Sequence, residues 1–201
     1  MKRWLPAALL AILACGDSTA PVAERSTFDF SDPAADTISF AGSDTIHPAL
    51  DVVEVSGTAA RDTLVLTVRF AGAIQSGSAA PNAAVGLIEL DVDADSATGI
   101  PAVTDEFANT AGIGVEFYVF VPGAGDAGVE VQDIATMQSA QFPASYTADA
   151  VTMRIPFSAI GDPTGAMRLI GLMGTSQRAT DLFPNGGSYL IDATATSRVT
   201  R

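Results

Sequence analysis

The stretch Val85–Gly99, VGLIELDVDADSATG, organises the rest of the chain. Its first half alternates between apolar and acidic residues, as in a strand whose side chains point to opposite faces in turn. This alternation predicts an apolar face with Ile88, Leu90 and Val92, and an acidic face with Glu89, Asp91 and Asp93. The stretch then enters an acidic turn at Asp95. We therefore expect a core strand that ends in a cluster of like charges, which is the best candidate for a functional site.

The spacing of Asp91, Asp93 and Asp95 is the D-x-D-x-D spacing of loops that bind hard cations. Calcium takes 6 to 8 oxygen ligands, and carboxylates are its preferred donors. The match to an EF-hand loop is incomplete, because Ser96 stands where the turn glycine belongs and Ala102 occupies the twelfth position. The pattern is compatible with a noncanonical calcium loop at the rim of a β-sandwich.

A neighbouring strand would complete such a site with Glu116 or Glu89, and bound Ca²⁺ would offset the repulsion between the carboxylates. The metal hypothesis therefore has the candidate ligands Asp91, Asp93, Asp95 and Glu116. The alternative is a solvated acidic face that leads into an Asx-type turn, in which aspartate side chains accept hydrogen bonds from nearby backbone. The sequence leaves both interpretations open.

Strand patterns recur on both sides of this stretch at the spacing typical of a β-sandwich. They predict strands at residues 51–56, 63–70, 85–93, 114–121, 129–134, 137–142, 146–155, 167–174 and 187–192. No part of the mature chain has helical periodicity beyond a single turn at 156–160. The expected fold is all-β: an antiparallel, jelly-roll-like β-sandwich of about eight or nine strands.

The first fifteen residues, MKRWLPAALLAILAC, have the organisation of an export signal. Lys2 and Arg3 precede a short apolar run that ends in small residues before Cys15. The run is too short to cross a bilayer, which requires about 20 apolar residues. Ile12–Cys15 resembles the lipobox of bacterial lipoproteins, so residues 1–14 are expected to be the signal peptide and Cys15 to carry acyl chains. The alternative is an ordinary signal peptide that leaves Cys15 as a free thiol.

Cys15 is the only cysteine, so the chain contains no intramolecular disulfide, and lipidation accounts for the unpaired thiol. Residues 15–27 are small and polar and are expected to form the lipidated tether, followed by a single domain at 28–201. The protein is expected outside the cytoplasm, held at the cell envelope by its lipid. In a cell with two membranes, Gly16 after the lipidated cysteine favours the outer membrane.

The mature chain is strongly acidic. Without residues 1–14 it has 8 Arg and no Lys against 23 acidic residues, a formal charge of −15. Nucleic acid is therefore excluded as a partner, because phosphate binding requires clustered basic residues. Cations, basic proteins and neutral ligands remain, and the acidity also serves solubility.

Other motifs add little chemistry. His47 is the only histidine, so a histidine ligand cluster is excluded, and the absence of lysine after Lys2 excludes lysine nucleophiles. Gly123–Gly128 fits G-x-G-x-x-G, but it leads into a strand and so predicts a hairpin loop rather than a nucleotide site. Trp4 leaves with the signal, and the tyrosines left for stacking on a glycan are Tyr118, Tyr146 and Tyr189.

Five short motifs in fixed order resemble a known group of proteins. They are DPAAD at 32–36, RFAG at 69–72, LDVD at 90–93 with Thr98-Gly99, GVEF at 114–117 and IPFSAI at 155–160. The order resembles exported bacterial proteins that are themselves similar to the DOMON and carbohydrate-binding-module jelly rolls. The resemblance implies an extracytoplasmic β-sandwich with a binding or structural role, and it assigns no ligand.

These observations favour a lipid-anchored, non-enzymatic binding module for a glycan or another envelope component, stabilised by calcium. One alternative is a carboxylate-based hydrolase of envelope polysaccharide, and another is a purely structural envelope protein. An exposed aromatic platform would favour glycan binding. A cleft with two carboxylates about 5 to 10 Å apart would favour hydrolysis.

Replacement of Cys15 by serine is expected to abolish lipidation, because serine lacks the thiol that carries the diacylglycerol. Metabolic labelling with a palmitate analogue, followed by detergent phase partitioning, measures this directly. The wild-type protein should be labelled and enter the detergent phase, and the variant should do neither. Label on the serine variant, or none on the wild type, would contradict the lipoprotein assignment.

Overall fold

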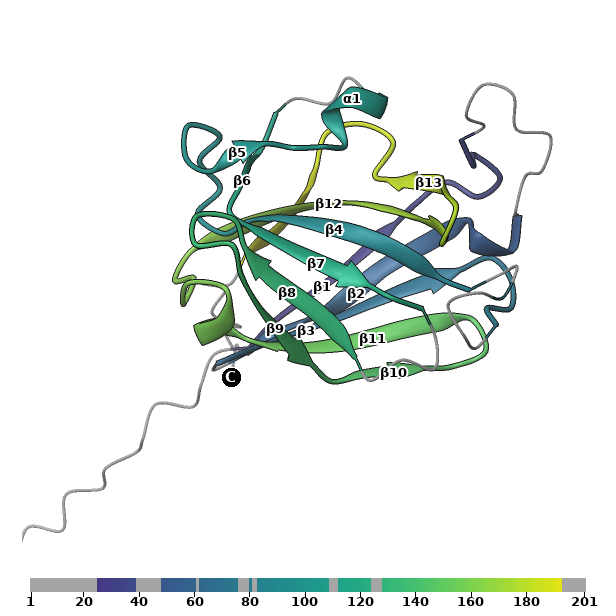
Figure 1. Cartoon of the computed structure of the whole chain (residues 1–201), viewed down its shortest axis with the longest axis horizontal. Helices are drawn as coiled ribbons and strands as arrows, with labels where there is room; N and C mark the ends of the chain where they lie inside the picture. The colour runs from purple at the N-terminus through teal and green to yellow at the C-terminus, as the bar shows by residue number, and fades with distance from the viewer. Residues whose placement is uncertain are drawn as a thin grey trace, which may run out of the picture.

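The computed structural model describes residues 25–38, 48–60, 62–75, 80, 83–108, 112–123 and 128–192. These residues form two large antiparallel sheets that pack face to face (Figure 1). The prediction of an all-β antiparallel sandwich is confirmed. The described part of the chain contains fourteen strands rather than eight or nine, because strands at 25–31, 100–101 and 178–183 add to the expected set and two expected strands each divide into two.

The first sheet has five strands in the order β1-β2-β3-β11-β10. Their bounds are β1 Arg25–Ser31, β2 Val52–Ala60, β3 Thr63–Phe70, β11 Ala150–Pro156 and β10 Ala144–Tyr146. β3 shows why this sheet forms: every second residue is buried, and the intervening residues are half-buried or exposed. A short 3-10 turn, η1 at Pro48–Leu50, leads into β2, and η2 at Phe157–Ala159 follows β11 where the sequence predicts one helical turn.

The second sheet has seven strands in the order β13-β12-β4-β7-β8-β9, with β14 also paired to β12. Their bounds are β13 Arg178–Phe183, β12 Ala166–Thr175, β4 Val85–Asp91, β7 Phe117–Val121, β8 Val129–Asp133, β9 Gln138–Phe142 and β14 Tyr189–Asp192. The strand β4 of the opening stretch lies between β12 and β7, and so it is central. Its end carries the candidate site into the loop beyond.

The two sheets bury one apolar core. Buried side chains from β2, β3 and β11 of the first sheet contact those from β4, β7, β8 and β12 of the second. Close packing leaves no room for larger residues at some positions. A side chain at Gly171 would meet the ring of Phe183 at 2.1 Å, so glycine lets this ring pack against β12.

The segment between β4 and β7 covers the outer side of the seven-stranded sheet and lies at the top of Figure 1. It consists of the two-stranded hairpin β5 (Ile100–Pro101) and β6 (Gly114–Val115) with the four-residue helix α1 (Asp105–Ala108). Val115 packs in this second cluster against Ile170, whereas Phe117 faces the main core. The prediction of one continuous strand at 114–121 is therefore wrong at Glu116, where the chain changes cluster. No described helix is long and apolar enough to cross a membrane.

The expected element boundaries need three further corrections. β1 begins at Arg25, so residues 25–27, expected in the tether, belong to the sandwich. The expected strand 146–155 is two strands, because a turn at Thr147–Asp149 separates β10 from β11. β13 was not predicted. The expected lipidation site Cys15, the signal peptide 1–14 and His47 lie outside the described residues.

Two methionines test the assignment of core and surface with the same substitution. Met153 on β11 is fully buried, and Met137 in the β8–β9 turn is 68 % exposed. Met153→Ala should lower the free energy of unfolding by about 2–5 kcal/mol, because it removes buried contacts and leaves a cavity. Met137→Ala should change it by less than about 0.5 kcal/mol. Urea unfolding of both variants is the measurement, and equal effects would contradict the assigned core.

Candidate metal centre

Three carboxylates meet at the end of β4, and we call Asp91, Asp93 and Glu116 the rim site. Asp91 is the last residue of β4, Asp93 lies in the following loop, and Glu116 lies between β6 and β7. One carboxylate oxygen of each lies within 4.8 Å of the others. The structure thus brings together three of the four predicted ligands from two segments of the chain.

Asp91 is the most unusual member of the rim site. Its side chain is fully buried, and neither carboxylate oxygen makes a hydrogen bond of normal geometry, although the nearby backbone N–H of Ala94 acts to lower its pKa. Arg168 stands opposite Asp91 in the β4–β12 register, but its Nη1 donates to Ser188 Oγ at 3.3 Å. A buried carboxylate without a hydrogen bond or counter-charge is strongly unfavourable. When Asp91 is ionised, no positively charged side chain in the described part of the chain compensates it.

Burial raises the pKa of the Asp91 carboxyl from its ordinary 3.8 to about 6, and the negative charges of Glu116 and Asp93 act in the same direction. A raised pKa in the folded state means that the folded chain favours the protonated acid. The contribution of Asp91 to stability is therefore fully present below about pH 4 and is lost as the pH rises through about 6. A bound cation would reverse this preference.

The hydroxyl of Thr98 lies among an excess of acceptor oxygens. Its Oγ1 is 2.7 Å from Glu116 Oε1, 2.8 Å from the Asp95 carbonyl oxygen, and 3.1 and 3.2 Å from the two oxygens of Asp93. A hydroxyl has one proton to donate, so it satisfies only one of these acceptors fully. The group therefore has more acceptor oxygens than hydrogen-bond donors, as a site for a hard cation does.

Asp95, the fourth predicted ligand, is turned away from this group. Its Oδ1 accepts a hydrogen bond from the backbone N–H of Ala97 at 2.9 Å, which is an Asx-type turn. Asp93 Oδ1 likewise accepts from the N–H of Asp95 at 2.9 Å. The loop thus contains both features that the sequence left as alternatives: the Asx turn orders the backbone, and the neighbouring carboxylates converge.

The backbone fixes the position of Glu116. Its N–H donates to the Leu90 carbonyl at 3.0 Å, and its Oε2 accepts from the N–H of Val92, also at 3.0 Å. Gly99 lies directly against it with a left-handed backbone (φ 62°), and a Cβ there would be 2.8 Å from Glu116 Oε1. Glycine at this position is therefore required for the approach of the loop.

Glu89 does not join the rim site, although the sequence offered it as an additional ligand. Its side chain is fully buried on the outer side of β4. Its carboxylate accepts hydrogen bonds from the N–H of Val103 at 2.6 Å and from the N–H and hydroxyl of Thr104 at 3.0 and 2.5 Å. Glu89 therefore anchors the turn before α1 to the sheet and is structural. The predicted solvated acidic face is wrong at Glu89 and at Asp91.

The rim loop, residues 92–99 after β4, borders three open hollows: one of about 470 Å³, lined mainly by residues 96–101, and two others. Of these two, one of about 400 Å³ is lined by Ala94, Ser96, Gly112, Arg168, Gly187 and Ser188. The other, of about 500 Å³, is lined by Gly99, Ile100, Val115, Glu116, Phe117, Asp133, Ile134 and Ala135. Residues of the rim loop line all three hollows, so the order of this loop determines the shape of all three surfaces.

The tyrosines proposed for glycan stacking are not arranged as a platform. Tyr189 is buried, with its ring stacked on Phe30 at a centroid distance of 4.6 Å. Tyr118 is half-buried and packs edge-on to Phe120 at 5.8 Å, and Tyr146 is also half-buried. Among the side chains whose burial the structure describes, no aromatic residue is fully exposed.

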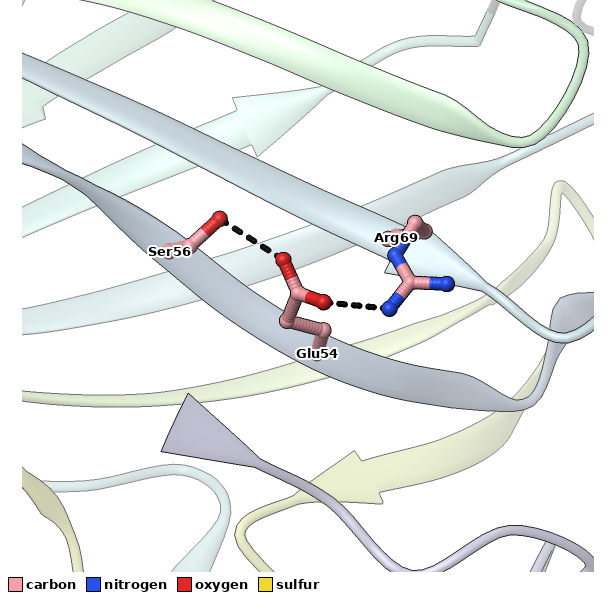
Figure 2. A network of polar contacts seen from close by, with 3 residues as sticks. All are labelled: Glu54, Ser56 and Arg69. Atoms are coloured by element: carbon pink, nitrogen blue, oxygen red, sulfur yellow. Dashed lines mark hydrogen bonds and ion pairs between the residues drawn. The ribbon is translucent and has the colours of Figure 1, made fainter. Parts of the chain in front are cut away.

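The polar network on the outer face of the five-stranded sheet consists of a cross-strand ion pair and one further hydrogen bond. Arg69 on β3 forms an ion pair with Glu54 on β2, and Ser56 Oγ donates to the other oxygen of Glu54 at 3.0 Å (Figure 2). Glu54 and Arg69 are cross-strand neighbours in the sheet register. The charges compensate one another, in contrast to those of the rim site.

Sequence reasoning missed two parts of the acidic chemistry. Thr98 is not among the predicted ligands, although its place in the acidic turn is a signal that it lies near the carboxylates. A second group, Asp32, Asp36 and Asp181, also brings carboxylate oxygens within 4.8 Å of one another.

Comparison with known protein families gives no match for this chain, and none of the curated proteins matches it.

The anchoring role of Glu89 predicts a specific loss of stability. Glu89→Gln keeps the side-chain size but replaces one acceptor with an amide that has no acceptor to meet, because backbone and hydroxyl donors surround it. We expect the free energy of unfolding to fall by about 1–3 kcal/mol. The control is Glu130→Gln on β8, where the side chain accepts from Gln141 Nε2 at the surface. It should change stability by less than about 0.5 kcal/mol, and similar losses for both variants in urea unfolding would refute the anchoring role.

Proposed function

We propose that this protein is a lipid-anchored, calcium-stabilised β-sandwich that acts as a non-enzymatic binding module at the outer surface of the cell envelope. The observation that carries the proposal is Asp91, a fully buried carboxylate without a partner that faces two further carboxylates. Anchoring rests on the lipobox at Cys15. The DOMON-like and carbohydrate-binding-module-like motifs support an extracytoplasmic role.

Calcium suits the rim site better than other cations do. All available ligands are oxygens: the carboxylates of Asp91, Asp93 and Glu116, the hydroxyl of Thr98 and the carbonyl of Asp95. Calcium accepts irregular shells of 6 to 8 such oxygens, whereas magnesium requires a near-ideal octahedron and retains water. Zinc and copper prefer nitrogen or sulfur ligands, which the rim site does not offer.

Binding is favoured over hydrolysis by the burial of Asp91. A glycosidase places both carboxyl groups against the sugar, one on each side of the scissile bond. Asp91 is closest to Glu116 and Asp93, but it has no surface that a substrate could reach. A buried carboxylate that holds a cation beneath a surface loop fits a binding module, because the cation orders the loop that lines the three hollows.

The 400 Å³ hollow points to a neutral, hydroxyl-rich ligand such as a glycan. Arg168, Ser96 and Ser188 line it and provide hydrogen-bond donors. Its volume lies in the range of ligand sites, roughly 300–1,000 Å³. Recognition would rest on polar contacts, because the described residues provide no exposed aromatic platform. The absence of that platform also favours a second candidate, a purely structural envelope protein stabilised by calcium.

The calcium part of the proposal predicts a shift in thermal stability. The intact protein in a mild non-ionic detergent should unfold at a higher temperature with CaCl₂ than with chelator at equal ionic strength. A ligand at a hundred times its Kd adds about 2.7 kcal/mol, or roughly 5 to 11 °C for a domain of this size. Asp91→Asn should remove the contribution of the rim site, because an amide is a weaker and uncharged ligand.

Asp95→Asn is the matched control for this experiment. It also removes one negative charge from the rim loop, but asparagine can still accept the hydrogen bond from Ala97 and the rim ligands are unchanged. Asp95→Asn should therefore keep the calcium response of the wild type. Equal responses of Asp91→Asn and the wild type would refute the rim site.

A further inference from the structure

Four aspartates gather where the edges of the two sheets meet, and we call Asp32, Asp36, Asp51 and Asp181 the seam cluster. Asp32 follows β1, an edge strand of the five-stranded sheet, and Asp181 lies on β13, an edge strand of the seven-stranded sheet. The segment 32–38 connects the two: its Asp32 N–H donates to the Val53 carbonyl at 3.1 Å, and its Ile38 N–H donates to the Thr180 carbonyl at 2.8 Å.

Each carboxylate of the seam cluster is held in place by one or two hydrogen bonds. Asp32 Oδ1 accepts from the hydroxyl of Tyr189 at 2.8 Å. Asp181 Oδ2 accepts from the N–H of Val52 at 2.6 Å. Asp36 Oδ2 accepts from Asn185 Nδ2, and Asp51 Oδ2 accepts from the N–H of Ala35 at 2.7 Å. The carboxylates are therefore positioned by the fold and are not loose surface groups.

The remaining oxygens of three of these residues have no partner. They are Asp32 Oδ2, Asp36 Oδ1 and Asp51 Oδ1, all buried. Asp32 is only 6 % exposed and Asp51 only 2 % exposed, so neither is solvated as a surface carboxylate is. Asp32 also belongs to the set whose oxygens lie within 4.8 Å of one another. Buried acceptors in this number require a donor or a cation.

The charged groups that act on the seam cluster are its own members. Burial raises the pKa of Asp181 to about 8, and the charges of Asp32, Asp36 and Asp51 add to this effect. Burial likewise raises the pKa of Asp32 to about 6, and Asp36 and Asp51 again act in the same direction. No basic side chain contributes to either shift. The cluster thus gathers acidic groups with no basic side chain of the described chain acting on Asp32 or Asp181, and without a cation these two residues favour the protonated form.

We propose that the seam cluster is a second calcium site, in which one Ca²⁺ joins the edge of the five-stranded sheet to the edge of the seven-stranded sheet. Its ligands are carboxylate oxygens of Asp32, Asp36 and Asp181, which lie within 4.8 Å of one another. The set contains no nitrogen or sulfur, which favours a hard cation. This site rests on its own residues and does not depend on the rim site.

The proposal predicts that one substitution, Asp36→Asn, raises the stability of the protein without calcium and reduces the stability that the protein gains from calcium. Asp36→Asn removes one charge from the half-buried member of the cluster, and the amide oxygen can still accept from Asn185. In chelator this variant should unfold at a higher temperature than its parent, because repulsion is reduced. In CaCl₂ it should gain less stability than its parent, with calcium affinity lowered at least tenfold.

The experiment uses the intact protein in detergent with Asp91→Asn as the background, so that the rim site is silent. Calorimetric titration with CaCl₂ should show one remaining calcium per chain, bound more tightly than Mg²⁺. Asp36→Asn in this background should weaken that binding. The matched control is Asp29→Asn, which removes a charge from the exposed side of β1 and should leave the titration unchanged.

Terbium gives a second, local measurement. Tb³⁺ occupies calcium sites and emits when a nearby tyrosine is excited, and the hydroxyl of Tyr189 touches Asp32. Emission should appear in the Asp91→Asn protein, fall on addition of Ca²⁺ and be weak in the Asp36→Asn double variant. No calcium binding in the Asp91→Asn protein would overturn the seam site, and so would an equal loss of stability on Asp36→Asn with and without calcium. If Asp36→Asn removes calcium binding and Asp91→Asn removes none of it, the result supports the seam site and refutes the rim site.

Discussion

Face-to-face packing of the two sheets is the interaction on which both acidic sites depend. The apolar core holds β4 in the middle of its sheet, where Asp91 ends the strand fully buried, and it brings β13 against the start of β2, where Asp181 is fully buried. Backbone N–H groups of Val52 and Leu182 donate to the two oxygens of Asp181, whereas neither oxygen of Asp91 accepts a hydrogen bond of normal geometry. Packing energy therefore holds these carboxylates in positions that are unfavourable for the charged form unless a cation or a proton compensates it.

A chain with a single cysteine has no disulfide to hold its edges together. On the present account, calcium takes that role at two places. The rim cation joins the end of β4 to the strand that begins after Glu116, and the seam cation joins the two sheets. The Arg69–Glu54 pair shows the contrast, because there the neighbouring charges balance and no further ion is needed.

The sequence predicted those parts of the structure that depend on local pattern. Alternation located β3 and β4, and D-x-D-x-D spacing located Asp91 and Asp93, two of the three carboxylates that converge at the rim site. Asp95 does not belong to that group, because its carboxylate accepts a hydrogen bond from the backbone N–H of Ala97 in a local Asx turn. β13 was missed because Asp181 interrupts its apolar pattern, and the burial of Asp181 depends on Val52, 129 residues away. The seam cluster could not be predicted, because its members come from segments that only the complete fold brings together.

The most direct test of the account is a crystal structure of the protein grown with CaCl₂, with anomalous diffraction recorded to locate calcium. We predict a peak about 2.3–2.6 Å from oxygens of Asp91 and Glu116, and a second peak at the same distance from oxygens of Asp32 and Asp181. Well-ordered carboxylates with only water or protons between them, and no anomalous peak at either place, would contradict the claim that cations compensate the buried charge.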